Sequence, residues 1–360
     1  MAESSTLTRN IALYPWFKFA QSLIFWQAVW FLYFQNVLSP AEAIILYAVY
    51  DISVTVLEVP SGYASDRLGR RRTLVAAAIC GVMGSGLLAV GSVFGVFALG
   101  QFFLGAAAAL ASGTDSALLY ESLAAEQRES EVEAQETRAL QFSLSGFALS
   151  AVTGGALALV NLPVTFWAAA VAMGASTLIA WRFVEPPRPD GPRARGGQMP
   201  AMRAALRQPV LRWIFALAVM MYGFSHLPFV FGQPFILSAL DQIGLAGQAP
   251  LVSGAVTAIM MGLSVVASLF ALRLKGVLGL PGILLLAFGM QIALIAVLTL
   301  TQSWLAIAVL FLRIVPDALS RPYKMGRIQP LLEDAARATY VSFQNLCGNC
   351  LLYTSPSPRD

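Results

Sequence analysis

The chain contains few charged residues. Asp, Glu, Lys and Arg together make up 12% of its 360 residues, whereas soluble domains contain about 25%. Hydrophobic residues make up 58%, and the mean hydropathy is +0.70. This balance excludes an ordinary soluble globular protein and predicts an all-α protein that crosses a membrane many times.

Groups for catalysis and metal binding are also scarce. The chain has one histidine and three cysteines, and it lacks a phosphate-binding loop or a nucleophile motif. We therefore expect no catalytic residue, no metal site and no cofactor, and we predict that the protein is not an enzyme. The net charge of +4 is spread over many loops, which argues against a nucleic-acid partner.

Cys347 and Cys350 form a C-x-x-C pair, a spacing that can indicate a redox site. However, residues 350–360 back-translate without a mismatch to a transposase-type sequencing-library adapter. We therefore interpret them as a non-native adapter-derived tail and expect a truncated chain. Under this interpretation Cys350 is not native, and the C-x-x-C pair has no function.

The basic residues are distributed unevenly between the apolar segments. Twenty of the 23 fall at Arg9 or in loops and helix ends on one predicted side, and the predicted loops of the other side have none. Positive charge collects on the cytoplasmic side of membrane proteins. The pattern predicts a multi-pass membrane protein with a cytoplasmic N-terminus. Arginine outnumbers lysine twenty to three, which suggests a bacterial gene, so we expect the bacterial inner (plasma) membrane.

The apolar segments predict ten spans and the start of an eleventh. Ser39, Pro40 and Glu42 are typical of a helix start, and prolines at 228 and 234 are expected to interrupt the seventh span. We expect an N-terminal bundle at 1–184, a cytoplasmic linker at 185–210, a partial C-terminal bundle at 211–349 and the tail. The second expected span begins at residue 40 and ends at the loop at 62–72, and the eleventh begins at 337. The other expected spans are 11–34, 73–93, 97–120, 138–160, 164–183, 211–237, 250–272, 281–300 and 304–323.

One loop holds a compact motif between the second and third spans. It follows the pattern G-x-x-x-D-R-x-G-R-R, with Gly62, Asp66, Arg67, Gly69, Arg70 and Arg71. This motif resembles the signature loop of the major facilitator superfamily. The resemblance implies two six-helix bundles related by pseudo-two-fold symmetry, with helix 11 incomplete and helix 12 missing from this chain.

A weak internal repeat points to the same architecture. Residues 102–105 (FFLG) resemble 310–313 (LFLR), and Arg138 with Ser143 corresponds to Arg337 with Ser342. Six spans, a linker and a second set in the same order are typical of a two-bundle secondary transporter.

Ionisable side chains within the spans are the candidates for a substrate or proton site, because charge at membrane depth is costly. Arg313 and Asp317 could instead form a structural ion pair with each other. Asp115 could be exposed at a helix end, and His226 could be a packing group. Lys18 is expected to be an anchor that reaches the membrane surface. The candidates are Asp51, Glu58, Asp115, His226, Arg313 and Asp317.

The resemblance also implies a mechanism, in which the motif forms a conformational latch between Asp66 and the start of helix 11 around Arg337. Residues 146–155 partly match an antiporter motif, which favours proton-coupled efflux of small amphipathic compounds by alternating access. The alternative is proton-coupled uptake of a sugar, organic acid or other metabolite. A remote alternative is a non-transporting membrane receptor or scaffold. The expected partners are a small-molecule substrate, protons and the lipid bilayer, and the expected state is a monomer.

Overall fold

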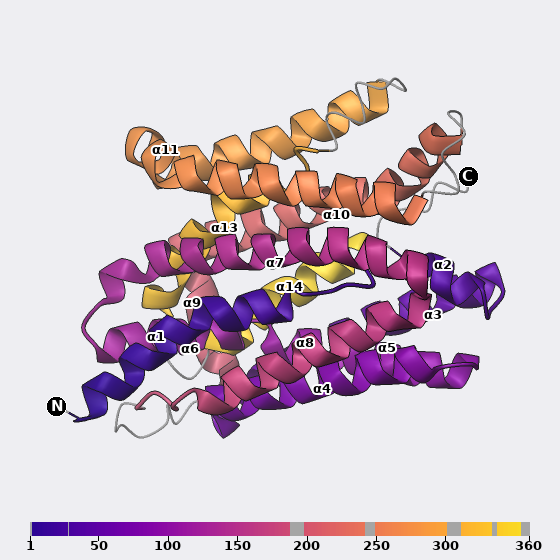
Figure 1. Ribbon diagram of the computed structural model, residues 1–360. Coiled ribbons are helices and arrows are strands. Elements are labelled where there is room, and N and C mark those ends of the chain that lie inside the picture. The colour runs from indigo at the N-terminus through magenta and orange to yellow at the C-terminus, as the bar shows by residue number, and fades with distance from the viewer. Residues whose placement is uncertain are drawn as a thin grey trace.

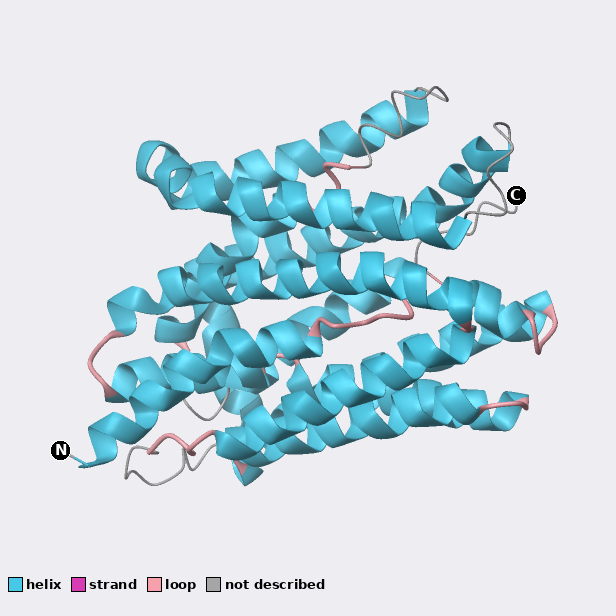
Figure 2. Cartoon of the chain, viewed as in Figure 1, coloured by secondary structure: helices cyan, strands magenta, loops and turns pink. Residues whose placement is uncertain are grey.

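The computed structural model describes residues 2–27, 29–187, 198–241, 249–300, 311–332 and 337–353. Within these ranges the chain forms helices and short connections, and no strand (Figure 2). The prediction of an all-α protein is therefore confirmed. Most of the long helices run side by side along one axis (Figure 1).

The N-terminal half, here called the N-half, contains the helices up to α8. They are α1 (Ala2–Gln21), α2 (Trp30–Gln35), α3 (Pro40–Leu68), α4 (Arg70–Val90), α5 (Phe94–Ala111), α6 (Thr114–Ala125), the 3₁₀ turn η1 (Glu129–Glu131), α7 (Val132–Val160) and α8 (Leu162–Arg182).

The C-terminal half, or C-half, contains the remaining helices. They are α9 (Gln198–Arg207), α10 (Pro209–Asp241), α11 (Ala249–Leu300), α13 (Val315–Ile328), the 3₁₀ turn η3 (Gln329–Leu331) and α14 (Arg337–Tyr353). Helix α11 turns back on itself at Gly279, where φ is +69° (Figure 1).

Six segments of the described chain are long and apolar enough to cross a membrane. A seventh is added if the helix pair Pro200–Arg207 and Pro209–Ser225, which bends by 95°, counts as one span. The six are Ala41–Leu68, Arg70–Val90, Phe94–Ala125, Glu129–Val160, Leu162–Arg182 and Ala255–Val297.

Local sequence signals explain where α3 begins. Ser39 Oγ accepts a hydrogen bond from Glu42 N at 3.3 Å, and Glu42 Oε2 accepts one from Ser39 N at 2.9 Å. This reciprocal cap satisfies two backbone donors that the first helical turn leaves free. The expected helix start is confirmed.

Several expected spans differ from the observed helices. The first breaks between α1 and α2, and the fourth breaks at Ser112 and Gly113, where Gly113 has φ +69°. The seventh was wrongly expected to be interrupted, because α10 continues through Pro228 and Pro234. The fifth starts earlier than expected, since the acidic segment from Val132 joins α7. The tenth is helical only from Val315, and residues 301–310 lie outside the described chain.

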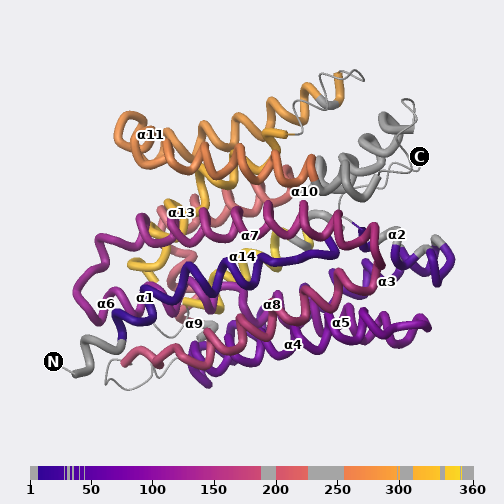
Figure 3. The backbone as a smooth tube through the Cα atoms, viewed as in Figure 1, coloured from indigo at the N-terminus to yellow at the C-terminus, as the bar shows by residue number. Residues whose placement is uncertain are grey.

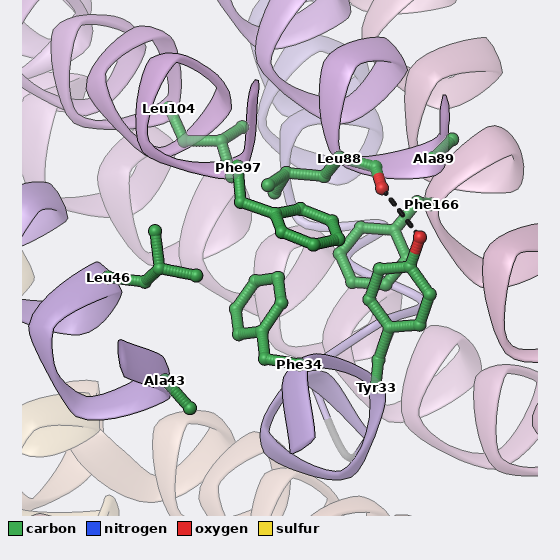
Figure 4. Packing of buried hydrophobic residues seen from close by; sticks show 9 residues of the cluster. All are labelled: Tyr33, Phe34, Ala43, Leu46, Leu88, Ala89, Phe97, Leu104 and Phe166. Atoms are coloured by element: carbon green, nitrogen blue, oxygen red, sulfur yellow. Dashed lines mark hydrogen bonds between the residues drawn. The ribbon is translucent and has the colours of Figure 1, made fainter. Parts of the chain in front are cut away.

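An aromatic core fixes the far end of the N-half. The rings of Tyr33, Phe34, Phe97 and Phe166 are buried against one another, and Tyr33 Oη donates to the Leu88 carbonyl at 2.9 Å (Figure 4). Close van der Waals packing of this kind holds helices together where lipid removes the usual hydrophobic advantage. The core keeps α2, α4, α5 and α8 together at the end opposite the arginine motif.

The two halves meet along α3 with α14 and along α7 with α11 and α13 (Figure 3). These pairs are far apart in the sequence, so the space between the halves is lined by helices from both. The candidate site lies in this space.

Candidate functional site

Asp66 lies at the end of α3 against the first turn of α14. Its carboxylate accepts hydrogen bonds from the backbone N–H groups of Ala338 at 3.3 Å and Thr339 at 3.2 Å, and from Thr339 Oγ1 at 2.6 Å. A helix N-terminus presents free N–H groups and a partial positive charge, which favour a carboxylate. The motif thus joins the N-half to the C-half.

Arg70 also takes part in this contact, and its side chain is buried. Its guanidinium pairs with Asp66 and also with Glu121, at 2.7 Å between Nη2 and Oε1. Arg337 of α14 lies 3.7 Å from the same Glu121 oxygen and 4.4 Å from the Tyr120 ring. Glu121 therefore contacts an arginine from each half. We call Asp66, Arg70, Glu121, Arg337 and Thr339 the latch, and this end of the molecule the latch face.

Gly62 lets α3 and α14 approach each other closely. A Cβ atom at this position would lie 3.0 Å from the Thr339 Cα and 2.8 Å from the Ser342 Oγ. Any side chain would therefore push the two helices apart, so the motif requires glycine here.

Gly69 makes room for an acidic side chain from beyond α8. Its φ is +111°, and a Cβ atom would lie 2.6 Å from Glu185 Oε1. That carboxylate accepts from the backbone N–H groups of Arg70 at 2.6 Å and Arg71 at 2.9 Å, which caps α4. Arg71 also donates to the Trp181 carbonyl at 2.8 Å. Arg67 is exposed and lies over the Tyr63 ring, which completes the placement of the motif.

A second ionic contact joins the halves at the same face. Glu133 of α7 pairs with Lys275 of α11, and the Lys275 Nζ lies 5.2 Å from the centre of the Tyr323 ring. The halves are thus in polar contact at two places on the latch face, one between α3 and α14 and the other between α7 and α11.

A cavity of about 470 Å³ lies between the halves. Its size is within the range of small-molecule sites. Its lining comes from α1, α3, α5, α6, α7, α10, α13 and α14, together with the break at Ser112 and Gly113. The charged residues of the lining are Lys18, Glu58, Asp115, Glu136, Asp317, Arg321 and Lys324.

Several of these charges are paired within the cavity wall. Lys18 Nζ lies 2.6 Å from Asp115 Oδ2, and Lys324 Nζ lies 3.9 Å from Asp317 Oδ1. The expectation that Lys18 anchors the helix at the membrane surface was wrong, because Asp115 holds it in the cavity. Arg321 has its side chain accessible from this space. A polar solute with several hydrogen-bonding groups matches such a lining.

Glu58 occupies a different part of the wall and is 1% exposed. Its Oε1 accepts from Ser112 Oγ at 2.6 Å and from Asn345 Nδ2 at 2.9 Å. Among the residues the structure describes, none of the basic side chains lies within ion-pair distance of Glu58. Burying a carboxylate without a cation is costly, so this position is suited to carry a proton.

The structure brings together only some of the expected site residues. Glu58, Asp115 and Asp317 line the cavity. Asp51 is half-buried in α3, and Arg313 lies in the turn before α13, and neither belongs to the lining. His226 is part of α10, but its side chain lies outside the described residues.

Sequence reasoning missed several polar residues of the lining, including three charged ones. Arg321 and Lys324 follow Asp317 by four and seven residues, a spacing that places all three on one helix face and could have revealed them. Glu136 follows several other acidic residues in the sequence, a pattern typical of a solvated face, yet it is 9% exposed and lines the cavity. Tyr14 had only its position one turn before Lys18 as a signal.

The glycine-rich stripe of α7 packs against the end of α1. Ser150 Oγ donates to the Ser22 carbonyl at 3.3 Å, and the hydroxyl groups of Ser22 and Ser143 lie 2.6 Å apart. A Cβ atom at Gly146 would lie 2.8 Å from the Phe19 carbonyl oxygen. The stripe therefore supports the point where the first span breaks.

Comparison with a protein-family model decides the family. The model described as Major Facilitator Superfamily matches residues 11–352. The chain belongs to the major facilitator superfamily. The fold expected from the arginine motif is confirmed, and no curated protein sequence matches the chain.

Solved structures of the superfamily show the same fold. The transporter FucP in its outward conformation has a TM-score of 0.72 and 14% identity, over 95% of this chain and 89% of FucP. A variant of the Escherichia coli fucose:proton symporter FucP gives 0.73 and 13%, over 96% and 90%. A variant of the nucleoside transporter NupG gives 0.65 and 15%, over 95% and 89%.

The superfamily fold explains the position of the cavity, because members of this fold place substrate near the interface of their two repeats. Within the described residues there is also no group of three or more His, Cys, Asp or Glu side chains that could hold a metal ion. The cavity is therefore the candidate transport site.

Proposed function

We propose that this member of the superfamily is a secondary transporter that takes up a small polar solute together with protons by alternating access. The observation that carries the proposal is the site of Glu58, a buried carboxyl group contacted by Ser112 of the N-half and Asn345 of the C-half. A proton on this group changes the contact between the halves, which is what coupling requires.

The polar lining supports a hydroxyl-rich solute such as a sugar or a nucleoside. Polar side chains line the cavity on both halves, among them Glu136 of the N-half and Gln344 of the C-half. Hydroxyl groups would satisfy them, whereas an amphipathic compound would leave most of the charged lining unmatched. The similar structures are described as a fucose:proton symporter and a nucleoside transporter, which agrees with this class.

Efflux of amphipathic compounds, which the sequence favoured, has less support. Its main signal was the antiporter-like stripe at 146–155. That stripe contacts α1 through Ser150 and Gly146, so its small residues are accounted for by packing. Uptake therefore becomes the preferred direction. We retain the bacterial inner membrane as the location, the latch face as the cytoplasmic side and a monomer as the working state.

Reconstitution into proteoliposomes tests the proposal. Uptake of labelled L-fucose and of labelled uridine should accelerate when the outside is made acidic, and Glu58→Gln should abolish the acceleration. Glu129→Gln, an exposed acid in η1, is the matched control and should behave like the wild type. Solute uptake at a rate that does not depend on the pH gradient would contradict proton coupling. Export of lipophilic dyes without uptake of either solute would favour efflux.

A further inference from the structure

Gln329 lies in the chain between the cavity-lining part of α13 and the latch residue Arg337. It opens the 3₁₀ turn η3 and is fully buried. Its side-chain Nε2 donates to Ser116 Oγ of the N-half at 3.2 Å, and its own carbonyl accepts from Arg337 Nε at 3.2 Å. One residue therefore contacts both the opposite half and the latch.

The contacts on either side extend this connection. Ser116 lines the cavity, and its backbone N–H donates to Asp115 Oδ1 at 2.7 Å. Asp115 in turn holds Lys18. At the other end Arg337 reaches Glu121 of the latch. A continuous series of polar contacts thus runs from the cavity ion pair to the latch, and Gln329 supplies the step between the halves.

Packing does not account for an amide at this position. The Oε1 atom of Gln329 is buried and has no hydrogen-bond partner among the described residues. Such an atom loses its hydration without compensation, so an apolar side chain of similar volume would be less costly there. Gln329 therefore has one unsatisfied polar atom and one hydrogen bond across the halves. Residues that break a local packing rule in this way are common at functional positions.

We propose that Gln329 is a positioning residue that couples the cavity to the latch. When a bound solute or proton alters the Lys18–Asp115 pair, Ser116 changes its hydrogen bonding, and the bond to Gln329 weakens. Because the Gln329 carbonyl holds Arg337, this change reaches the contact between Arg337 and Glu121. The proposal rests on the proposed function only in taking the cavity as the solute site.

A double-mutant cycle on the whole chain tests the coupling without a known solute. The three cysteines are replaced by serine, and spin labels are placed at Arg72→Cys of α4 and Arg327→Cys of α13, two exposed positions on the latch face. Asp115→Asn serves as the cavity perturbation. It should change the ratio of open to closed latch distances by about 2-fold to 30-fold, the usual range of such coupling.

Removal of the amide should disconnect the two sites. In a Gln329→Leu background the same Asp115→Asn change should alter the ratio by less than about twofold. Ser116→Ala removes the other end of the bond with a smaller change in volume and should have the same effect. Gln291→Leu, a buried glutamine of α11 at another place in the C-half, is the matched control and should leave the coupling intact.

Two results would overturn the inference. One is an Asp115→Asn shift of full size in both the Gln329→Leu and the Ser116→Ala backgrounds, and the other is no shift in the wild-type background. Loss of solute uptake with the coupling preserved would instead count against the proposed function alone.

Discussion

Asn345 of α14 donates a hydrogen bond to Glu58 of α3, with 2.9 Å between Nδ2 and Oε1. The same amide also reaches Ser112, where the fourth span breaks. The bond crosses from one half of the molecule to the other. Movement of α14 away from α3 must therefore break it, so the state of Glu58 and the position of α14 depend on each other.

The first prediction concerns proton coupling at Glu58. Glu58→Gln keeps the size of the side chain but cannot bind and release a proton. We expect uptake driven by a pH gradient to fall by about 5-fold to 150-fold, the range of a typical coupling free energy, while exchange of solute without a gradient persists. Both rates are measured in proteoliposomes, and equal loss of both would indicate a structural role instead.

The second prediction concerns the latch. Asp66→Asn removes the negative charge that Arg70 and the α14 N-terminus share. Hydrogen bonds to charged groups contribute about 1.5–3 kcal/mol, so the closed state should lose a similar amount and the latch-face distance between labels at 72 and 327 should lengthen. Transport should slow while membrane insertion remains normal. Unchanged turnover would argue against the latch.

The third prediction tests the second ionic contact. Glu133→Lys and Lys275→Glu should each favour the open latch face, because each places like charges together. The exchange of both should restore the closed state. The side chains of Glu133 and Lys275 are 26% and 28% exposed, so the effect should be modest, about 0.2–1 kcal/mol. Spin-label distances measure it, and failure of the double exchange to restore closure would exclude a simple ion pair.

The fourth prediction concerns Gly69 and Glu185. Gly69→Ala places a Cβ atom against the Glu185 carboxylate at a positive φ, which should cost about 1–3 kcal/mol and lower the thermal unfolding midpoint. Glu185→Ala should relieve the clash but not the backbone strain, and it also removes the cap of α4, so the double variant should recover only partly.

Gly86→Ala is the matched control for this prediction. Gly86 lies in the same helix, α4, and nothing lies within 4 Å of the position that its Cβ would take. The midpoint should stay the same or rise, because alanine favours helix. An equal fall in the two glycine variants would contradict the clash.

The sequence was sufficient for the class of fold and for the arginine motif, because both depend on local patterns. Runs of apolar residues determine spans, and the spacing of Gly62, Asp66 and Arg70 is visible within nine consecutive residues at the junction of α3 and α4. The broken helices were less accessible. At the break between α5 and α6, Ser112 forms hydrogen bonds with Glu58 and Asn345 of other helices, and the sequence alone does not reveal such contacts.

The cavity was predicted only in part, because burial of charge depends on which helices become neighbours. The position of Lys18 near a helix end favoured a surface anchor, but in the structure its ammonium group pairs with Asp115 of another helix. Glu136 resembled its solvated acidic neighbours in the sequence, and only the packing of α7 against the C-half makes it a cavity residue. Pairing between distant helices is the information that a single sequence does not contain.

Gly62 gives the latch a purely steric component. The space beside it is filled by Thr339 and Ser342 of α14, so one methyl group would act as a wedge between α3 and α14. The volume of the residue at this position therefore sets how closely the halves can rest, independently of pH and of ionic strength. The close packing of α3 and α14 therefore depends on shape at position 62 as well as on charge at Asp66.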